Sequence, residues 1–299
     1  MFEERPIAAP LGAQIHCGKV LELDERSRVR LRDALTRHLV LLIRDQDLSD
    51  PELIAFGRTF GDLDVAPLAY TDGHRERQHE EVIVVSNVKE GGVPIGVLGD
   101  AEVVWHSDNS YRETPLAASM LYGIEIPAEG GETGFVNMYL ALETLPAGLR
   151  AAIEGRRLKH DATYNSAGVL RRGFVATSDV RAAPGPWHPI VRTHPQSAHD
   201  ALYLGRRPNA YIGGLSNEDS EALLNALWAH ATRPQVAWHH TWRRGDILVW
   251  DNRCVMHHRN PFDPAARRVM HRIQCKGERP YYDARSAQLG RHPRSLAAA

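Results

Sequence analysis

The chain has 299 residues, of which 43% are hydrophobic, and its formal net charge of -1 comes from 36 Lys and Arg against 37 Asp and Glu. This length supports one large β-rich domain or two smaller ones, and we expect a single domain over residues 1–299, with a partly ordered tail at residues 285–299. The balanced charge lacks the basic stripe that nucleic-acid binding requires, so no nucleic-acid partner is expected.

Short apolar runs and scattered cysteines exclude two further classes of protein. The apolar run at residues 39–43 is far too short to span a bilayer, and residues 1–5 have neither the charge pattern nor the apolar core of a signal peptide. We therefore expect a cytoplasmic protein with no membrane partner. Cys17, Cys254 and Cys275 are too few and too scattered for a disulfide framework or a zinc cluster, so they are expected to serve in packing.

The first part of the chain alternates helical and strand signals. Residues 24–38 carry apolar positions at loosely helical spacing and predict an amphipathic helix, and residues 39–43 predict a buried strand. Ser49, as an N-cap candidate, starts a second predicted helix that Gly61 ends. Residues 81–88 form a β-branched run of strand type, and the glycine-rich stretch after them is expected to be a loop.

The middle of the chain is predicted to mix strands, helices and one long loop. Residues 118–126 read as a buried strand, and residues 138–155 are helical in pattern with a break at Pro146. Residues 159–189 have little periodicity, and we interpret them as a long irregular segment of the kind that often forms functional lids.

The last part of the chain contains the clearest helix. Ser216 is followed by an apolar stripe of period 3.6 that ends near Ala231. Residues 238–251 alternate around a turn at residues 243–246, which predicts a hairpin, and residues 267–274 predict a last strand. Many short antiparallel strands with helices outside them favour an α+β, mainly β fold. We expect a jelly roll of the cupin type (a double-stranded β-helix) with flanking helices and a helical and loop insert.

The stretch Trp105-His106-Ser107-Asp108 is the strongest candidate for chemistry. Side chains two apart in extended backbone leave the same face, so His106 and Asp108 present an imidazole and a carboxylate together. These are two of the three ligands of a 2-His-1-carboxylate site for Fe(II). The third ligand must be a downstream histidine, from among His188, His194, His199, His230, His239, His240, His257, His258 and His271.

His257 is favoured by its position after the predicted hairpin, but His258 is its rival. The two point to opposite faces of a strand, so only one reaches the metal, and periodicity alone does not decide which. Arg268 and Arg272 share one face of the last strand. Either they are solvated charges at a strand end, or they are buried and need an anionic partner such as a dianionic cosubstrate.

Three motifs together resemble one enzyme family. They are Trp105-His106-Ser107-Asp108, Glu129-Gly130-Gly131-Glu132-Thr133, and Trp250-Asp251-Asn252-Arg253 followed by His257, Arg268 and Arg272. The set is similar to the taurine dioxygenase and 2,4-dichlorophenoxyacetate dioxygenase (TauD/TfdA) family of Fe(II)/2-oxoglutarate enzymes. The N-terminal stretches at residues 38–46 and 56–61 also match, so the resemblance covers most of the chain.

The resemblance implies a role for each candidate residue. His106, Asp108 and His257 would ligate the iron at the catalytic centre, which resolves the choice between His257 and His258. Thr133 and Arg268 would bind the far carboxylate of 2-oxoglutarate, and Arg272 would face an anionic group on the primary substrate. Tyr164 and Asn165, with Ser166, are candidates for a substrate lid; the alternative is an ordinary surface loop.

The resemblance also implies a reaction. With Fe(II), 2-oxoglutarate and O2, the enzyme would hydroxylate a small anionic molecule, an aryloxyalkanoate-like carboxylate or a sulfonate, and release succinate and CO2. Hydroxylation next to a heteroatom would cleave the substrate. The carboxylate of Asp108 argues for hydroxylation, because related halogenases carry a small residue at that position. Self-association into a homo-oligomer is expected because it is common in the family.

Two other classes of protein are alternatives to the oxygenase. A cupin-like metal-binding protein without oxygenase activity would keep His106, Asp108 and His257, but would have no need for Arg268 or Thr133. A zinc hydrolase would use a metal-bound hydroxide, and its turnover would neither depend on oxygen nor release succinate.

Overall fold

Two β-sheets form the centre of the protein, in a computed structural model that describes residues 2–7, 9–65, 79–99, 103–165 and 168–284. The tail expected at residues 285–299 and the lid candidate Ser166 lie outside the described residues. The larger sheet has eight strands in the order β1 (Glu3–Pro6), β2 (Ala13–His16), β3 (Val40–Ile43), β17 (Ile247–Asp251), β9 (Ala118–Glu125), β19 (Val269–Cys275), β4 (Ile83–Ser86) and β7 (Val97–Leu98). Its pairs are antiparallel except for β2 with β3 and β4 with β7.

The smaller sheet is antiparallel and has four strands in the order β16 (Ala237–His240), β10 (Thr133–Asn137), β18 (Val255–Arg259) and β8 (Val103–His106). Short strands complete the described part: β5 (Lys89–Glu90) with β6 (Val93–Pro94), β12 (Trp187–Pro189) with β11 (Arg157–Lys159) and β15 (Tyr211–Ile212), and β13 (Val191–Thr193) with β14 (Asp200–Leu202).

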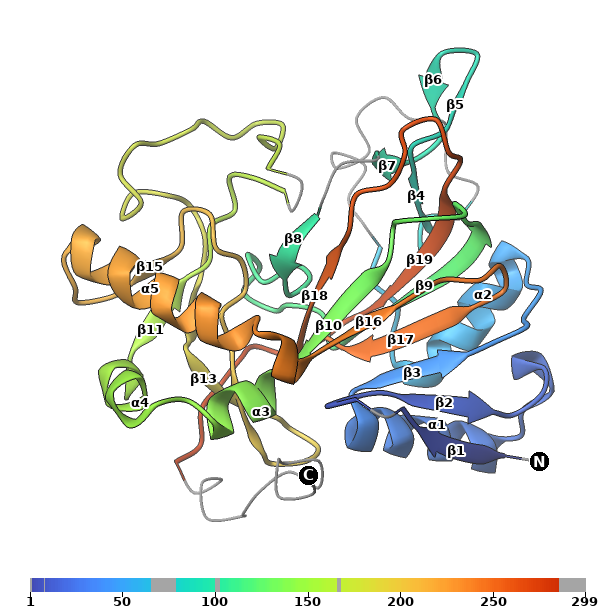
Figure 1. Cartoon of the computed structure of the whole chain (residues 1–299), viewed down its shortest axis with the longest axis horizontal. Helices are drawn as coiled ribbons and strands as arrows, with labels where there is room; N and C mark the ends of the chain where they lie inside the picture. The colour runs from blue at the N-terminus through green and yellow to red at the C-terminus, as the bar shows by residue number, and fades with distance from the viewer. Residues whose placement is uncertain (1, 8, 66–78, 100–102, 166–167, 285–299) are drawn as a thin grey trace.

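Helices lie on both sides of these sheets (Figure 1). They are α1 (Glu25–His38), α2 (Asp50–Gly57), α3 (Met138–Glu143), α4 (Ala147–Ile153) and α5 (Asn217–Ala231), with 3-10 turns at Val20–Glu22, Arg58–Phe60 and Pro234–Val236. In Figure 1, α1 and α2 lie beside the N-terminal strands of the larger sheet, whereas α3 to α5 and the short strands β11 to β15 form a separate group at the left. This group is the insert that the sequence predicted between the two halves of the metal motif.

The central strands of the larger sheet are buried on both faces, which explains why they read as continuous aliphatic runs. Val40 and Leu42 of β3 pack into the core cluster that also contains Leu248 of β17 and Phe135 of β10. The intervening Leu41 packs into a second cluster, with the apolar faces of α1 and α2. Because successive side chains of a strand point to opposite faces, each face of the larger sheet packs into a different core cluster.

The predicted helices are confirmed, and their caps explain where they begin. Asp24 accepts a hydrogen bond from the Ser27 backbone amide at 2.8 Å at the start of α1. Ser49 and Glu52 form a capping box at the start of α2, and Ser216 accepts from the Asp219 amide at 3.0 Å at the start of α5. Each cap supplies an acceptor for a backbone amide that has no partner inside the helix.

The predicted hairpin at residues 238–251 is wrong. β16 joins β10 in the smaller sheet, whereas β17 lies between β3 and β9 in the larger one. The turn between them is a corner that the buried carboxylate of Asp246 holds: it accepts from Arg44 at 2.8 Å and lies 2.9 Å from His240 Nε2. The chain therefore changes sheets here instead of folding back on itself.

The glycine-rich stretch after β4 is more regular than predicted. It contains the two-stranded hairpin β5–β6 and the short strand β7, which extends the larger sheet. Gly91 and Gly92 adopt φ values of 59° and 84°, and this left-handed backbone makes the tight turn of the hairpin.

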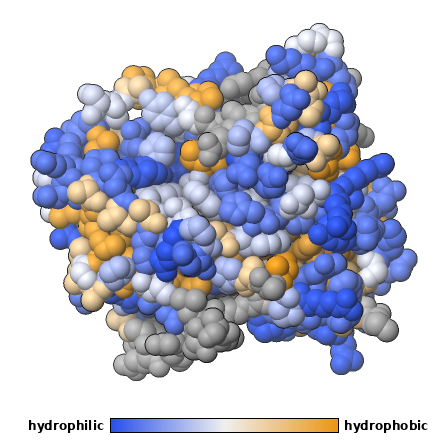
Figure 2. All heavy atoms as spheres, in the orientation of Figure 1, coloured by the Kyte–Doolittle hydropathy of each residue, from blue (hydrophilic) through white to orange (hydrophobic). Residues whose placement is uncertain are grey.

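The surface in view is mostly hydrophilic. Figure 2 shows hydrophilic residues over most of one face, with hydrophobic residues in small groups. Within the described residues, no helix combines the length and apolarity needed to cross a membrane. Cys254 and Cys275 are buried and Cys17 is partly buried; all three are free thiols, as their expected packing role requires.

Burial of the larger sheet on both faces predicts which substitutions lower the free energy of unfolding. Leu248→Ala removes a fully buried side chain from β17, so it should lower the free energy of unfolding by about 2–5 kcal/mol, as measured by urea denaturation. Val29→Ala on the exposed face of α1 is the control and should change it by no more than about 0.5 kcal/mol. Equal effects of the two substitutions would contradict this packing.

Candidate active site

Pairing of β8 with β18 places two histidines side by side. His106, the last residue of β8, is the register partner of His257 in β18, and their ring centroids are 4.2 Å apart. Both side chains are buried, with only 5% and 8% of their surfaces exposed. Two residues far apart in the sequence thus become cross-strand neighbours, which lets them face a common point.

Asp108 joins them through a turn that Asn252 holds. The Asp108 backbone amide donates to Asn252 Oδ1 at 2.7 Å, and Asn252 Nδ2 donates to the Asp108 carbonyl at 2.9 Å. β8 ends at His106, so the extended spacing assumed from the sequence does not reach Asp108. The side-chain amide of Asn252, in the Trp250-Asp251-Asn252-Arg253 motif, thus fixes the backbone of Asp108, a role that the sequence reasoning missed.

The three side chains converge as metal ligands do. Asp108 Oδ1 lies 3.4 Å from His106 Nε2 and 3.7 Å from His257 Nε2, and the three ligand atoms lie within 4.8 Å of one another. His106 Nδ1 is 2.8 Å from the Val104 carbonyl, so it donates there and leaves the Nε2 lone pair for a metal. The donor set of two imidazoles and one carboxylate fits Fe(II).

Burial and charge keep His257 and Asp108 in their ligating forms. Burial first, and then the neighbouring His106, hold the pKa of His257 well below its ordinary value, so the His257 ring is neutral. Burial alone would raise the pKa of Asp108, but Arg272 and the two histidines hold it well below its ordinary value. Asp108 is therefore a carboxylate, and His257 has a free lone pair for a metal.

In the described structure, the rings of the other downstream histidines contact groups outside the triad. His258 packs against Trp105 with ring centroids 4.0 Å apart and ring planes tilted by 36°, and its Nε2 lies 2.9 Å from that of His239. The remaining rings bind backbone carbonyls or carboxylates: His188 with Ser110, His194 with Asp251, His230 with Ala141, His240 with Asp246 and His271 with Asp50.

A second buried group of metal-binding residue types consists of His194, Asp251 and Cys254. Its carboxylate is already engaged, because Arg253 donates to both oxygens of Asp251, at 2.8 and 2.6 Å. His194 Nε2 lies 2.9 Å from the same carboxylate, and His194 Nδ1 accepts from the backbone amide of Ser197. This group is an internal ion-pair network that supports the Asn252 turn, not a metal site.

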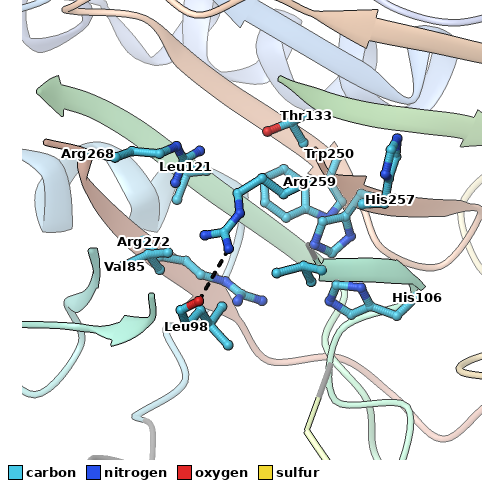
Figure 3. Close-up of a pocket in the computed structure, with 12 residues that line it drawn as sticks. Val85, Leu98, His106, Leu121, Thr133, Trp250, His257, Arg259, Arg268 and Arg272 are labelled. Carbon is cyan, nitrogen blue, oxygen red and sulfur yellow. Dashed lines mark hydrogen bonds between the residues drawn. The ribbon is translucent and has the colours of Figure 1, made fainter. Parts of the chain in front are cut away.

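A pocket opens beside the triad, between the two sheets (Figure 3). Its lining combines apolar side chains, three histidines, three arginines and one threonine: Val85, Leu98, Val103, His106, Leu121, Thr133, Trp250, His257, His258, Arg259, Arg268 and Arg272. In Figure 3 the guanidinium groups of the three arginines lie on the same side of the histidine pair. The pocket is therefore suited to an anion that reaches the metal position.

Arg268 is the most informative of these arginines. Its side chain is 1% exposed, and none of its three guanidinium nitrogens has a hydrogen-bond partner among the described residues. Burial, with a smaller effect of Arg259, lowers its pKa to about 9, so it stays charged at neutral pH. Its guanidinium carbon lies 5.8 Å from the centre of the Phe262 ring, but a buried cation without hydrogen bonds is still costly, and an anion bound in the pocket would relieve that cost.

Thr133 and Gly131 shape the same end of the pocket. Thr133 Oγ1 accepts from Trp242 Nε1 at 2.9 Å, which leaves the hydroxyl proton of Thr133 available to a second acceptor. Gly131 has a φ of 70°, and a Cβ there would lie only 3.2 Å from Arg268 Nε. The glycine of this motif thus provides both the turn and the space for the arginine.

Arg272 and Arg259 line the pocket with different partners. Arg272 makes an ion pair with Asp108 Oδ2. Arg259, which the sequence reasoning missed, donates to the carbonyls of Gly99 at 3.0 Å and Leu98 at 3.2 Å (Figure 3). Its spacing of two from His257 was the available signal, since residues two apart on a strand share a face.

The lid candidates lie elsewhere. Tyr164 and Asn165 are outside the pocket lining. The Tyr164 carbonyl accepts from Arg206, and Asn165 Oδ1 accepts from the Val169 amide at 2.9 Å. In the described structure these contacts form a loop beside the site, and their substrate-binding role stays a prediction.

Comparison with known proteins gives a consistent result. Residues 3–274 match the profile of the family described as "Taurine catabolism dioxygenase TauD, TfdA family". The chain is 34% identical to pentalenolactone F synthase of Streptomyces arenae, over 91% of this chain and 94% of that protein. It is 32% identical to the alpha-ketoglutarate-dependent 2,4-dichlorophenoxyacetate dioxygenase of Burkholderia sp. (strain RASC), over 83% and 85% of the two chains.

Solved structures show the same similarity. A taurine dioxygenase from Burkholderia xenovorans superposes with a TM-score of 0.76 at 30% identity, covering 93% of this chain and 90% of that one. The structure of AAD-2 in complex with Mn(II) and N-oxalylglycine superposes with a TM-score of 0.75 at 28% identity, covering 94% and 100%.

The geometry predicts which histidine binds metal. His257→Ala removes one of the three converging ligand atoms and should abolish tight Mn(II) binding, measured by isothermal titration under anaerobic conditions. His258→Ala, at the next position, should retain it because that ring contacts His239 and Trp105 instead. Loss of binding in the second variant and retention in the first would reverse the assignment.

Proposed function

The chain belongs to the TauD, TfdA family of Fe(II)- and 2-oxoglutarate-dependent dioxygenases, and from this premise we propose how its own residues divide the work. His106, Asp108 and His257 would hold the iron. When bound, the iron and 2-oxoglutarate supply oxidative decarboxylation with O2, which yields succinate and CO2 and hydroxylates the substrate. The two sheets that meet at this site support a double-stranded β-helix core, and residues from both support treating the chain as one domain.

The protein ligands prepare the site before any cosubstrate arrives. The Val104 carbonyl orients the His106 ring, and Asn252 fixes the backbone of Asp108. Three protein ligands leave the remaining positions of an octahedral ion open to exogenous groups. Burial of the ligands excludes bulk water, so the charged groups around the ion act in a medium of low dielectric constant.

Arg268 is the central residue of the proposed cosubstrate site. We propose that its guanidinium and the Thr133 hydroxyl bind the far carboxylate of 2-oxoglutarate, while the keto acid end reaches the metal. The supporting observation is a fully buried guanidinium without hydrogen-bond partners in the described structure, in the same pocket as the two histidines. A planar guanidinium binds a carboxylate bidentately, which would satisfy several of these donors at once.

The primary substrate is proposed to be a small anion, an aryloxyalkanoate-like carboxylate or a sulfonate, with cleavage where the hydroxylated carbon carries a heteroatom. Arg272 would meet the anionic group. Among the described residues its Nη1 makes no hydrogen bond, so a donor remains for a ligand. Names of relatives that specify 2,4-dichlorophenoxyacetate, (S)-phenoxypropionate and a sulfate ester support this class.

Family membership argues against the two other classes considered from the sequence. A metal-binding cupin without oxygenase activity and a zinc hydrolase would each have no use for an unpaired, buried arginine beside the metal position. Arg268 therefore supports the oxygenase independently of the similarity to other proteins.

Removing Arg268 tests the cosubstrate site. Arg268→Ala should raise the KM for 2-oxoglutarate by about 10- to 100-fold, since it deletes a charge-assisted interaction of roughly 1.5–3 kcal/mol. Succinate release at varied 2-oxoglutarate provides the measurement. Arg267→Ala is the matched control, because the neighbouring arginine is exposed and pairs with Glu125 instead of lining the pocket. An unchanged KM in Arg268→Ala would remove this residue from the site.

A panel of small molecules tests the substrate class. Aryloxy acids, alkyl sulfonates and alkyl sulfate esters should be compared for their stimulation of succinate release. We expect at least one anionic class to stimulate, and the neutral amide of the same molecule to stimulate far less, because the amide gives Arg272 no charged partner. Equal stimulation by acid and amide would contradict the anionic substrate.

A further inference from the structure

We propose that Ser119 and Gln274, two residues of the larger sheet, are positioning residues for Asp108. Together with Arg272 they fix Oδ2 of Asp108 and leave Oδ1 as the single carboxylate ligand. This inference rests on the proposed function, because it assigns Asp108 to the metal. It adds two residues that belong to none of the motifs in the sequence.

The two oxygens of Asp108 have different surroundings. Oδ1 faces the Nε2 atoms of His106 and His257. Oδ2 faces the larger sheet, where the Ser119 hydroxyl donates to it at 2.6 Å and Arg272 forms an ion pair with it. One oxygen therefore points to the metal position while the other is held by two donors.

Sheet register explains why these donors meet. Ser119 of β9 is the direct register partner of Gln274 of β19, and Leu121 is the partner of Arg272 two positions along. Residues two apart share a face, so Ser119, Arg272 and Gln274 all point from the larger sheet towards the smaller one. Ser119 is 1% exposed and Gln274 is 4% exposed, so water cannot replace their contacts freely.

Gln274 holds the arginine in turn. With its amide assigned from the hydrogen-bond network, the Gln274 oxygen accepts from Arg272 Nε at 3.1 Å and from Nη2 at 2.6 Å. The guanidinium thus lies between the amide oxygen and the carboxylate. Nε and Nη2 are thus engaged, and Nη1 of this pocket-lining arginine is the donor assigned above to the substrate.

The expected consequence is a preorganised carboxylate. The oxygen Oδ2 accepts from a neutral hydroxyl and a cation, and such charge-assisted contacts restrict rotation of the carboxylate about its Cβ–Cγ bond. Without Ser119, Asp108 keeps the Arg272 contact but loses the donor that fixes its plane. Metal affinity should fall, because outer-shell partners orient the ligands that contact the ion.

Metal titration of the apoprotein tests this without turnover. Ser119→Ala should weaken Mn(II) binding by about 10-fold or more, within the 10- to 100-fold range for partners of metal ligands. Gln274→Leu should weaken it in the same direction, and Ser119→Thr, which keeps the hydroxyl, should restore most of the affinity. Ser220→Ala removes an equally buried serine in α5 and should leave it unchanged.

The controls distinguish the proposed metal site from the positioning role of Ser119 and Gln274. Wild-type protein that binds Mn(II), and Asp108→Ala that does not, uphold the proposed metal site whatever Ser119 does. If Ser119→Ala and Gln274→Leu then bind Mn(II) as tightly as wild type, the positioning role is wrong while the site stands. Melting temperatures of each variant show whether it is folded, and Gln274→Leu carries the test if Ser119→Ala does not fold.

Discussion

The pairing of β8 with β18 is the interaction on which the site depends. It places His106 opposite His257, and the next strand, β10, pairs with β18 on its other side and brings Thr133 opposite Arg259. Because side chains alternate between faces, a slip of one residue in this ladder would turn His257 away from the metal position. The backbone hydrogen bonds between β8 and β18 therefore hold the two histidines of the triad in place, whereas Asn252 holds Asp108.

Charge is the second constraint. Asp108 is a buried carboxylate close to two histidines, and three arginines share the neighbouring pocket. The ion pair between Asp108 and Arg272 compensates one cation, whereas Arg268 has no hydrogen-bonding partner among the described residues. The folded protein thus keeps a positive potential where a dianionic cosubstrate would bind, and the favourable free energy of that binding offsets the cost of burying the arginine.

Much of this arrangement was predictable from the sequence. Helix caps at Asp24 and Ser216 act locally, so the predicted helices are confirmed. Arg268 and Arg272 were placed on one strand face by period-2 alternation, and both line the pocket. The hairpin at residues 238–251 was wrong because turn signals show where the chain bends and not which sheet receives each strand. Ser119 contacts Asp108, and Gln274 contacts Arg272, through the register of β9 with β19, which no local pattern of the sequence encodes.

The most direct test is an anaerobic titration of the purified apoprotein with Fe(II) followed by 2-oxoglutarate, monitored by visible absorption. If the three side chains hold one iron whose open positions accept a keto acid, a weak charge-transfer band should appear only when both are present. A protein that binds Fe(II) but develops no band on addition of 2-oxoglutarate would contradict this account.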